Sequence, residues 1–338
     1  MHAQPPMKIL MLVPFPGIQG PLNKHTGHLV EALRSLGCDV ITEPWGRHSD
    51  HEAPWDKIGG RARDIARIWR RLRRERCDLL LIKTAHTWAG LLRDVPLLVA
   101  TRWLVRHAVI QFHGSASNWL VAPGRPLFKL CTALQVRLCD AVLVLSREEQ
   151  RDWHRFYPAR PCWVVSNPFV PARASWAPAP EDWHLPPGTP VVLYVGRLIA
   201  PKGIIDLIRA MPRILEFTPC HLLVAGSGPD ELRVRREIEA AGIERHITLV
   251  GYITGKQLAA AYRAASVFVL PTYWPEGFPV VINEAMDAGL PIVTTHTRGA
   301  ADRLVPGTHA LFVPARDPVA LADAIIQLLT DPQLRDTM

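Results

Sequence analysis

Residues Pro271–Pro291 read P-T-Y-W-P-E-G-F-P-V-V-I-N-E-A-M-D-A-G-L-P, and this stretch decides the fold. The apolar run Ala265–Leu270 before it is typical of a buried strand in a parallel sheet. Prolines and Gly277 then indicate a turn, and Pro279 is predicted to be the first residue of a helix that ends at Gly289. The pattern predicts strand, loop and helix. The start of such a helix attracts anions, because its unpaired N–H groups and its dipole point at one spot.

Two carboxylates flank the start of this helix. Glu276 lies in the loop before it, and Glu284 lies in its second turn. One carboxylate can accept hydrogen bonds from sugar hydroxyls and the other from a ribose diol, while phosphates lie on the N–H groups near Val280 and Val281. The alternative is a surface helix with a solvated glutamate. The surrounding glycines and prolines favour the ligand site.

The segment E-G-F-P-V-V-I-N-E-A-M-D-A-G-L-P-I-V-T-T is similar to the E-x7-E segment of the family 4 retaining glycosyltransferases. The resemblance covers nearly the whole chain. It implies an α/β protein of the GT-B fold, with two Rossmann-like domains whose parallel sheets face each other across a central cleft. It also implies that Glu276 orients a donor sugar, that Glu284 holds the ribose, and that Gly277 and Phe278 lie against the donor.

Length and composition agree with two soluble domains. The chain has 338 residues, of which 48% are hydrophobic and 21% are charged. No window qualifies as a membrane span, and the N-terminus runs into a strand without a cleavage-like site. The six cysteines are scattered, which indicates free thiols in a reducing compartment. We therefore expect a cytoplasmic protein with neither a disulfide framework nor a metal cluster.

Composition also locates the domain boundary. Residues 168–190 are rich in proline and lack periodicity, which is typical of a linker between domains at 1–167 and 191–338. Residues 1–170 carry a net charge of +10, whereas residues 171–338 carry −2. The first half of the chain is thus expected to meet an anionic surface, and the second half is not.

The first domain opens with a β-α-β unit. Its first loop contains Gly17 and Gly20, which can let the backbone approach a ligand at the end of the strand Lys8–Val13; the alternative is a long mobile loop. His113 follows the strand Ala108–Phe112 and precedes a glycine. Here a histidine can bind a sugar hydroxyl or move a proton, or it can be a satisfied structural residue. The resemblance favours contact with the donor sugar.

The segment Gly59–Arg76 predicts a basic amphipathic helix. Apolar residues recur at helical spacing, and eight arginines, within Arg61–Arg76, surround the other faces. Such a helix can lie on an anionic membrane surface, or it can be a solvated outer helix, and both can hold. Nucleic-acid binding is not expected, because aromatic residues other than Trp69 do not interrupt the arginines and no recognition motif is present.

In the second domain, the strand Val191–Val195 leads into G-R-L-I-A-P-K-G. Arg197 and Lys202 flank a tight turn next to Gly196, where the two cations can neutralise a diphosphate. The alternative is a pair of solvated surface cations. The family 4 enzymes place their diphosphate-binding arginine and lysine at the matching positions, so the resemblance favours a phosphate site.

Two further glycines follow the strand His221–Ala225. The loop starts as G-x-G, but Glu231 occupies the third glycine position, so the dinucleotide fingerprint fails. The resemblance implies that Gly226 and Gly228 border the nucleotide and that its base stacks near Tyr252. The sequence departs from the pattern at Arg298 and Asp302, and it ends at Met338 where relatives continue into a helix that crosses back to the first domain. These departures leave domain closure and full activity open.

Together with these residues, the resemblance implies a retaining glycosyltransferase that uses a nucleotide-diphosphate sugar, such as a UDP- or GDP-sugar, and no cofactor. No D-x-D-like cluster follows a strand, so the expected electrophiles are side-chain cations and a helix N-terminus. A saccharide or lipid-linked acceptor fits the basic first domain and the eleven tryptophans. A nucleotide-sugar epimerase of the same fold and a catalytically impaired binding module remain alternatives.

Overall fold

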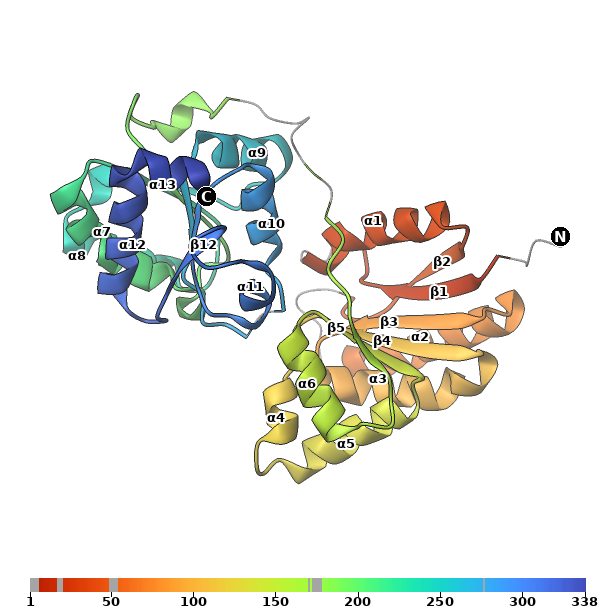
Figure 1. The fold of residues 1–338 in the computed structure, drawn as a ribbon. Helices are drawn as coiled ribbons and strands as arrows, with labels where there is room; N and C mark the ends of the chain where they lie inside the picture. The colour runs from red at the N-terminus through yellow and green to blue at the C-terminus, as the bar shows by residue number, and fades with distance from the viewer. Residues whose placement is uncertain (1–5, 17–20, 49–53, 170, 172–177, 276) are drawn as a thin grey trace. The chain divides into compact units, whose positions relative to one another are not determined.

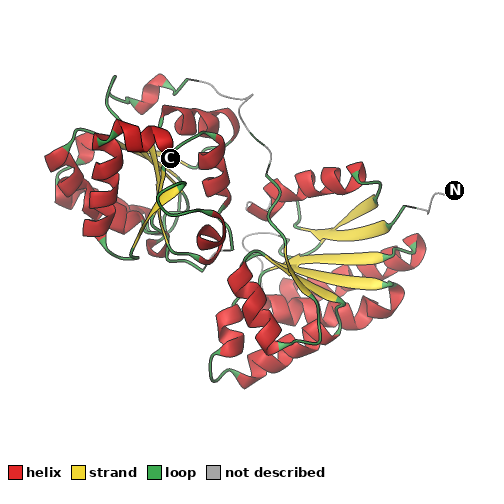
Figure 2. Ribbon diagram, in the orientation of Figure 1, coloured by secondary structure: helices red, strands yellow, loops and turns green. Residues whose placement is uncertain are grey.

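The computed structural model describes all residues except 1–5, 17–20, 49–53, 170, 172–177 and 276. The chain divides into two compact units, Met1–Phe169 and Val170–Met338. In each unit the described strands form a parallel sheet with helices on its faces (Figures 1 and 2). This is the α/β architecture that the alternation of apolar runs and helical patterns predicts. The described residues contain no helix that is long and apolar enough to cross a membrane.

The sheet of the first unit has the strand order β2-β1-β3-β4-β5-β6. Its strands are β1 (Lys8–Val13), β2 (Asp39–Pro44), β3 (Leu79–Thr84), β4 (His107–Phe112), β5 (Ala141–Val144) and β6 (Cys162–Val164). Its helices are α1 (Pro21–Ser35), α2 (Pro54–Glu75), α3 (Trp88–Thr101), the 3-10 turn η1 (Arg102–Leu104), α4 (Ser117–Val121), α5 (Pro126–Arg137) and α6 (Arg147–Phe156).

The two faces of this sheet have separate cores. On one face, side chains of α2, α3, α5 and α6 pack with alternate residues of the strands, including Ile68, Leu97, Phe128 and Trp153. On the other face, Val30 of α1 packs on β1, β2 and β3. The alternation follows from the period of two along a strand. As a result, α2, α3 and α5 lie together on the face opposite α1 (Figure 1).

The sheet of the second unit has the order β12-β11-β10-β7-β8-β9. Its strands are β7 (Val191–Val195), β8 (His221–Ala225), β9 (Ile247–Gly251), β10 (Val267–Leu270), β11 (Ile292–Thr295) and β12 (Ala310–Val313). Its helices are η3 (Glu181–Trp183), η4 (Ala200–Lys202), α7 (Ile204–Phe217), α8 (Glu231–Ala241), η5 (Glu244–His246), α9 (Gly255–Ala264), α10 (Val280–Asp287), α11 (Arg298–Arg303), α12 (Pro318–Thr330) and α13 (Pro332–Thr337).

Strand order locates the ligand edge of each sheet. In the first unit the order reverses between β1 and β3, and in the second it reverses between β7 and β10. The crevice beyond the carboxyl ends of the strands at such a reversal is where open α/β sheets bind ligands. The loops that carry the predicted site residues of the second unit, after β7 and β10, therefore start at its reversal point.

Two local details of the decisive stretch can be compared with its prediction. Pro279 is not the first helical residue: it has an extended backbone and precedes α10, whose first residue is Val280. The prediction was one position early, because a proline with ψ near 125° continues the loop instead of starting the helix. Gly289 ends the helix as predicted, with a left-handed φ of 69° that glycine adopts without strain.

The proline-rich segment joins the units, and its last part packs on the second one. Trp183 is buried in the core of the second unit, and its carbonyl oxygen accepts a hydrogen bond from the Thr248 hydroxyl at 3.1 Å.

Candidate active site

The loop after β7 carries Arg197 and Lys202 on a rigid support. Tyr194 is fully buried in β7, and its hydroxyl donates to the carbonyl oxygen of Arg197 at 3.2 Å. The η4 turn ends at Gly203, whose φ of 77° is left-handed. The buried Tyr194 and the η4 turn thus hold the two ends of the predicted phosphate-binding loop.

This loop is joined to the decisive stretch after β10. The carbonyl oxygen of Pro201 accepts from the N–H groups of Tyr273 at 2.9 Å and Trp274 at 3.1 Å. A Cβ atom on Gly203 would overlap the carbonyl oxygen of Pro271, so only glycine allows this approach. The structure therefore brings the Arg197–Lys202 loop and the Pro271 loop together. Glu276, the proposed catalytic carboxylate, lies outside the described residues.

The two cations of this loop influence each other. Desolvation and, to a smaller extent, the positive charge of nearby Arg197 together lower the pKa of Lys202 to about 8. Arg197 itself is exposed. Two basic side chains on one loop, one of them partly desolvated, can together oppose the charge of a bound dianion. The diphosphate-binding role of the two side chains stays a prediction.

The backbone before α10 is fixed by close packing. Gly299 of α11 has its Cα against Gly277, and a Cβ there would overlap the Gly277 carbonyl oxygen. Phe278 is buried, and the Arg303 guanidinium lies 4.8 Å from the centre of its ring. Among the described residues no side chain caps the first turn of α10. Its N–H groups, including those of Val280 and Val281, are thus the predicted phosphate donors.

Glu284 is positioned by a tyrosine that sequence reasoning missed. The hydroxyl of buried Tyr262, on α9, donates to Glu284 Oε2 at 3.0 Å and lies 3.2 Å from the Val281 carbonyl oxygen. Burial and the negative charge of Glu284 raise the pKa of Tyr262 well above its ordinary value, so the phenol stays a donor. The sequence A-A-A-Y-R offers no signal for this, because the contact joins residues 22 positions apart.

Two glycines after β8 allow the loop there to pack closely against the loop after β7. A Cβ on Gly226 would overlap the carbonyl oxygen of Gly196, and one on Gly228 would overlap that of Leu198. The Ala200 N–H donates to Asp230 Oδ2 at 2.6 Å, which ties the two loops further. Tyr252, which follows β9, is exposed. The donor-binding roles of these residues stay predictions.

In the first unit, a buried carboxylate holds the loop that contains His113. This histidine directly follows β4, and its N–H donates to the Thr84 carbonyl oxygen at 2.8 Å. Glu149 on α6 is fully buried and accepts from the Ser115 N–H at 2.8 Å, from the Leu145 N–H at 3.0 Å and from the Ser146 hydroxyl at 3.1 Å. Glu149 thereby joins the loops after β4 and β5.

Two buried basic side chains near the ligand edge of the first unit were also not predicted from the sequence. His86 lies among Phe112, Phe128 and Trp153, and desolvation lowers its pKa to about 3. It is therefore a neutral residue of the core. Lys83, at the end of β3, is buried with its Nζ 3.4 Å from the Thr26 hydroxyl, and desolvation lowers its pKa to about 8. Gly17 and Gly20, predicted in the adjacent loop, lie outside the described residues.

Comparison with known families bears on both units. Residues 178–338 match the family described as Glycosyl transferases group 1, and residues 22–173 match Glycosyltransferase Family 4. The chain belongs to the family 4 glycosyltransferases. The phosphatidyl-myo-inositol mannosyltransferase of Mycobacterium leprae is 37% identical over 164 residues, which cover 48% of this chain and 43% of that relative. The aligned part is thus less than half the length of the relative.

Solved structures confirm the GT-B fold that the sequence predicts for this family 4 member. The sucrose-phosphate synthase of Thermosynechococcus elongatus superposes with a TM-score of 0.78 at 23% identity, over 98% of this chain and 92% of that one. Anabaena HepE in complex with UDP-glucose superposes with a TM-score of 0.71 at 19% identity, over 98% and 92% of the two chains. At these identities the likeness concerns the fold.

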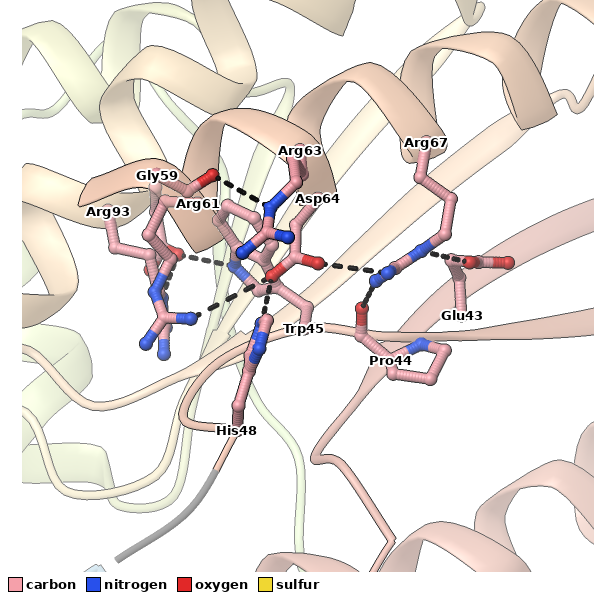
Figure 3. A network of polar contacts seen from close by, with 11 residues as sticks. Glu43, Pro44, Trp45, His48, Gly59, Arg61, Arg63, Asp64, Arg67 and Arg93 are labelled. Atoms are coloured by element: carbon pink, nitrogen blue, oxygen red, sulfur yellow. Dashed lines mark hydrogen bonds and ion pairs between the residues drawn. The ribbon is translucent and has the colours of Figure 1, made fainter. Parts of the chain in front are cut away.

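In the basic helix α2, some arginines form ion pairs with residues of the same unit. Buried Asp64 contacts Arg67 at 2.9 Å and His48 at 2.7 Å, and Arg67 also binds Glu43 at 2.7 Å (Figure 3). Arg61 lies 3.7 Å from the same Asp64 (Figure 3). Four other arginines of α2 are exposed: Arg63, Arg70, Arg73 and Arg74. The helix is therefore both a structural element and a cationic surface.

Among the described residues, no group of three or more histidine, cysteine, aspartate or glutamate side chains is arranged to hold a metal ion. The six cysteines are free thiols.

Proposed function

We propose that this protein is a retaining, metal-independent glycosyltransferase that moves a sugar from a UDP- or GDP-sugar to a saccharide or lipid-linked acceptor. The observation that carries the proposal is the desolvated Lys202 beside Arg197, on a loop hydrogen-bonded to the one that leads into α10. Membership in the family supports the same reaction class.

The proposed chemistry assigns leaving-group stabilisation to these cations. As the bond between the sugar and the diphosphate breaks, negative charge grows on the phosphate oxygens, and Arg197, Lys202 and the N–H groups at the start of α10 oppose it. Fixed donors of this kind need no reorganisation when the charge develops, so they stabilise the transition state more than water can. They supply the electrophilic role that a metal ion has in other transferases.

The other residues position the substrates. Glu284, held by Tyr262, accepts from the ribose diol, and Glu276 orients the sugar. His113 contacts the donor sugar from the first unit. Retention follows if the departing phosphate takes the proton of the acceptor hydroxyl on the face that it leaves. In this scheme no group of the protein forms a covalent bond to the sugar.

The charge of the first unit and the name of one relative support the proposed class of acceptor. The unit is strongly basic, and the Mycobacterium leprae relative is named for an acceptor lipid, a phosphatidyl-myo-inositol. We therefore propose synthesis of a cell-surface polysaccharide or glycolipid on the cytoplasmic face of the plasma membrane. An assay with and without acceptor separates this function from that of a nucleotide-sugar epimerase.

Replacing Arg197→Ala together with Lys202→Ala tests the proposal. We expect kcat/KM for donor turnover to fall roughly a thousandfold or more, because two charges that oppose the leaving group are lost. The matched control is Arg233→Ala with Lys256→Ala, two exposed cations of the same unit. If donor turnover is unchanged in the Arg197→Ala/Lys202→Ala variant, or falls equally in this variant and in the control, the assignment of leaving-group stabilisation to these cations is contradicted.

The pKa of Lys202 gives a second readout. Because this pKa is about 8 and a bound diphosphate favours the charged ammonium, the Kd of a nucleotide diphosphate should be flat between about pH 7 and pH 8, where the terminal phosphate is already a dianion. Above it, the Kd should rise by up to about tenfold per pH unit, since each binding event must then take up a proton. Calorimetry at increasing pH on the wild type and on Lys202→Met tests this. A parallel rise in both proteins would show that another group titrates.

A further inference from the structure

Helix α3 exposes a face without charged side chains. Trp88, Leu92, Val99 and, in the following η1 turn, Trp103 are all exposed and recur at spacings of four or seven residues. This spacing places them along one side of the helix. The two charged residues of α3, Arg93 and Asp94, lie away from this side: they bind each other, and Trp45 donates to Asp94 at 2.8 Å.

Helix α5 widens this apolar face. Leu127, Leu130 and Leu134 are exposed at spacings of three and four residues, and α5 packs beside α3 on the same face of the sheet (Figure 1). Trp88 of α3 meets Phe128 of α5 edge-on, with ring centres 5.3 Å apart. The two helices therefore present one continuous surface, which we name the α3–α5 face. Contiguous exposed apolar surface of this kind marks an interaction site.

The stretch of chain that forms the α3–α5 face is rich in positive charge. Between Trp88 and Arg137 the sequence contains six lysines and arginines and one acidic residue, the buried Asp94. Arg125, Lys129 and Arg137 lie on or next to α5. On the other side of α3 lies α2, which it contacts, with the exposed arginines named above. Arg102 and Arg106 are partly neutralised, by Asp140 at 2.8 Å and Asp78 at 3.9 Å.

We propose that the α3–α5 face docks on an anionic lipid bilayer, with its tryptophans and leucines at the level of the headgroups. Exposed tryptophan and leucine surrounded by arginine and lysine is the composition of interfacial membrane surfaces. The Trp103 indole N–H already donates to the Ala100 carbonyl oxygen at 2.6 Å, so the ring can enter the interface without losing a hydrogen bond.

A second copy of the chain is the less favourable occupant. In a two-fold symmetric dimer the same face meets itself, and the cations at its edge would then face cations. An anionic surface instead neutralises them. The inference concerns a surface apart from the donor site, so it stands or falls independently of the proposed transfer reaction.

Vesicle flotation of the full chain tests this surface. We expect binding to vesicles of equal parts phosphatidylglycerol and phosphatidylcholine, and much weaker binding to phosphatidylcholine alone. Leu92→Ser with Leu130→Ser should weaken binding to the anionic vesicles roughly tenfold or more, because two apolar side chains no longer leave water.

A matched control is available in the same chain. Leu36→Ser with Leu232→Ser also removes two exposed leucines, one after α1 on the opposite side of the first sheet and one in the second unit. The four leucines are similarly exposed, at 69% and 66% for Leu92 and Leu130 and 78% and 71% for Leu36 and Leu232. The control should float like the wild type.

The outcomes separate the possible occupants. Equal flotation of both double variants, or equal binding to neutral vesicles, overturns the proposal. So does a concentration-dependent dimer, seen by sedimentation, that only the Leu92→Ser/Leu130→Ser variant loses. Binding of UDP and GDP is measured in parallel without vesicles: a chain that floats but binds neither nucleotide would contradict the proposed function and leave this inference intact.

Discussion

The loops at the ligand edges of the two units are held together by different kinds of contact. At the edge of the second unit, backbone packs on backbone: Gly203, Gly226, Gly228 and Gly299 each lie where a Cβ would overlap a carbonyl oxygen of a neighbouring loop. At the edge of the first unit, buried side chains do the joining, with Glu149 binding the loops after β4 and β5. Both edges follow the last residues of parallel strands.

This difference explains why one edge is easier to recognise in a sequence. A backbone contact leaves no freedom in the residue type, because only glycine fits, so the loop has a visible pattern. A side-chain contact can be made by many residue pairs, so it leaves no pattern. The edge of the second unit is therefore more constrained in sequence than the edge of the first.

The largest effect should come from breaking a backbone contact. Gly226→Ala places a Cβ on the carbonyl oxygen of Gly196, and the φ of 156° at this position is unfavourable for alanine. We expect the second unit to lose about 3 kcal/mol or more of unfolding free energy and the chain to lose nucleotide binding. Urea unfolding and calorimetry with UDP and GDP measure the two effects.

Gly242→Ala is the control for this prediction. Gly242 also has a left-handed φ, of 66°, but a Cβ there would meet no atom within 4 Å. The Gly242→Ala variant should lose about 1 kcal/mol of unfolding free energy from backbone strain alone, and its nucleotide binding should be unchanged. If both alanine variants behave alike, the close approach of the two loops does not matter, and the contrast between the edges loses its basis.

The sequence anticipated more of the loop packing at the second unit's edge than at the first unit's edge. The meeting of the Arg197 loop with the Pro271 loop was predictable, because the glycines and prolines that shape both loops are local signals. Pro279 was placed one residue too early, because its ψ depends on packing before α10. Glu149 and Tyr262 were not predictable, since each acts through partners that only the folded chain brings near.

An intermediate effect should come from the first unit's carboxylate. Glu149→Gln removes the charge that strengthens hydrogen bonds from Ser115, Leu145 and Ser146, and it leaves an amide N–H₂ group facing donors. We expect the first unit to lose about 2 kcal/mol of unfolding free energy. Hydrogen exchange in peptides that cover His113–Ser115 should accelerate, while nucleotide binding by the second unit stays unchanged.

Glu31→Gln, an exposed change on α1, controls for the loss of a negative charge from the same unit. It should alter neither hydrogen exchange near His113 nor stability by more than about 0.5 kcal/mol. Equal exchange rates in the wild type and Glu149→Gln would mean that the loops after β4 and β5 are held by something other than this carboxylate.

The smallest effect should come from a side-chain contact within the second unit, the one between Tyr262 and Glu284. Tyr262→Phe keeps the buried ring but removes the hydroxyl that donates to Glu284 at 3.0 Å. If Glu284 holds the ribose, its carboxylate then becomes less well oriented, at a cost of about 1 kcal/mol, or roughly a fivefold rise in the Kd of the nucleotide. Once the donor is bound, kcat should change little, because the contact is remote from the breaking bond. Tyr157→Phe in the first unit is the matched control. A fall in kcat with unchanged nucleotide affinity would instead place Tyr262 and Glu284 near the reacting atoms, and the roles of the two glutamates would then need to be exchanged.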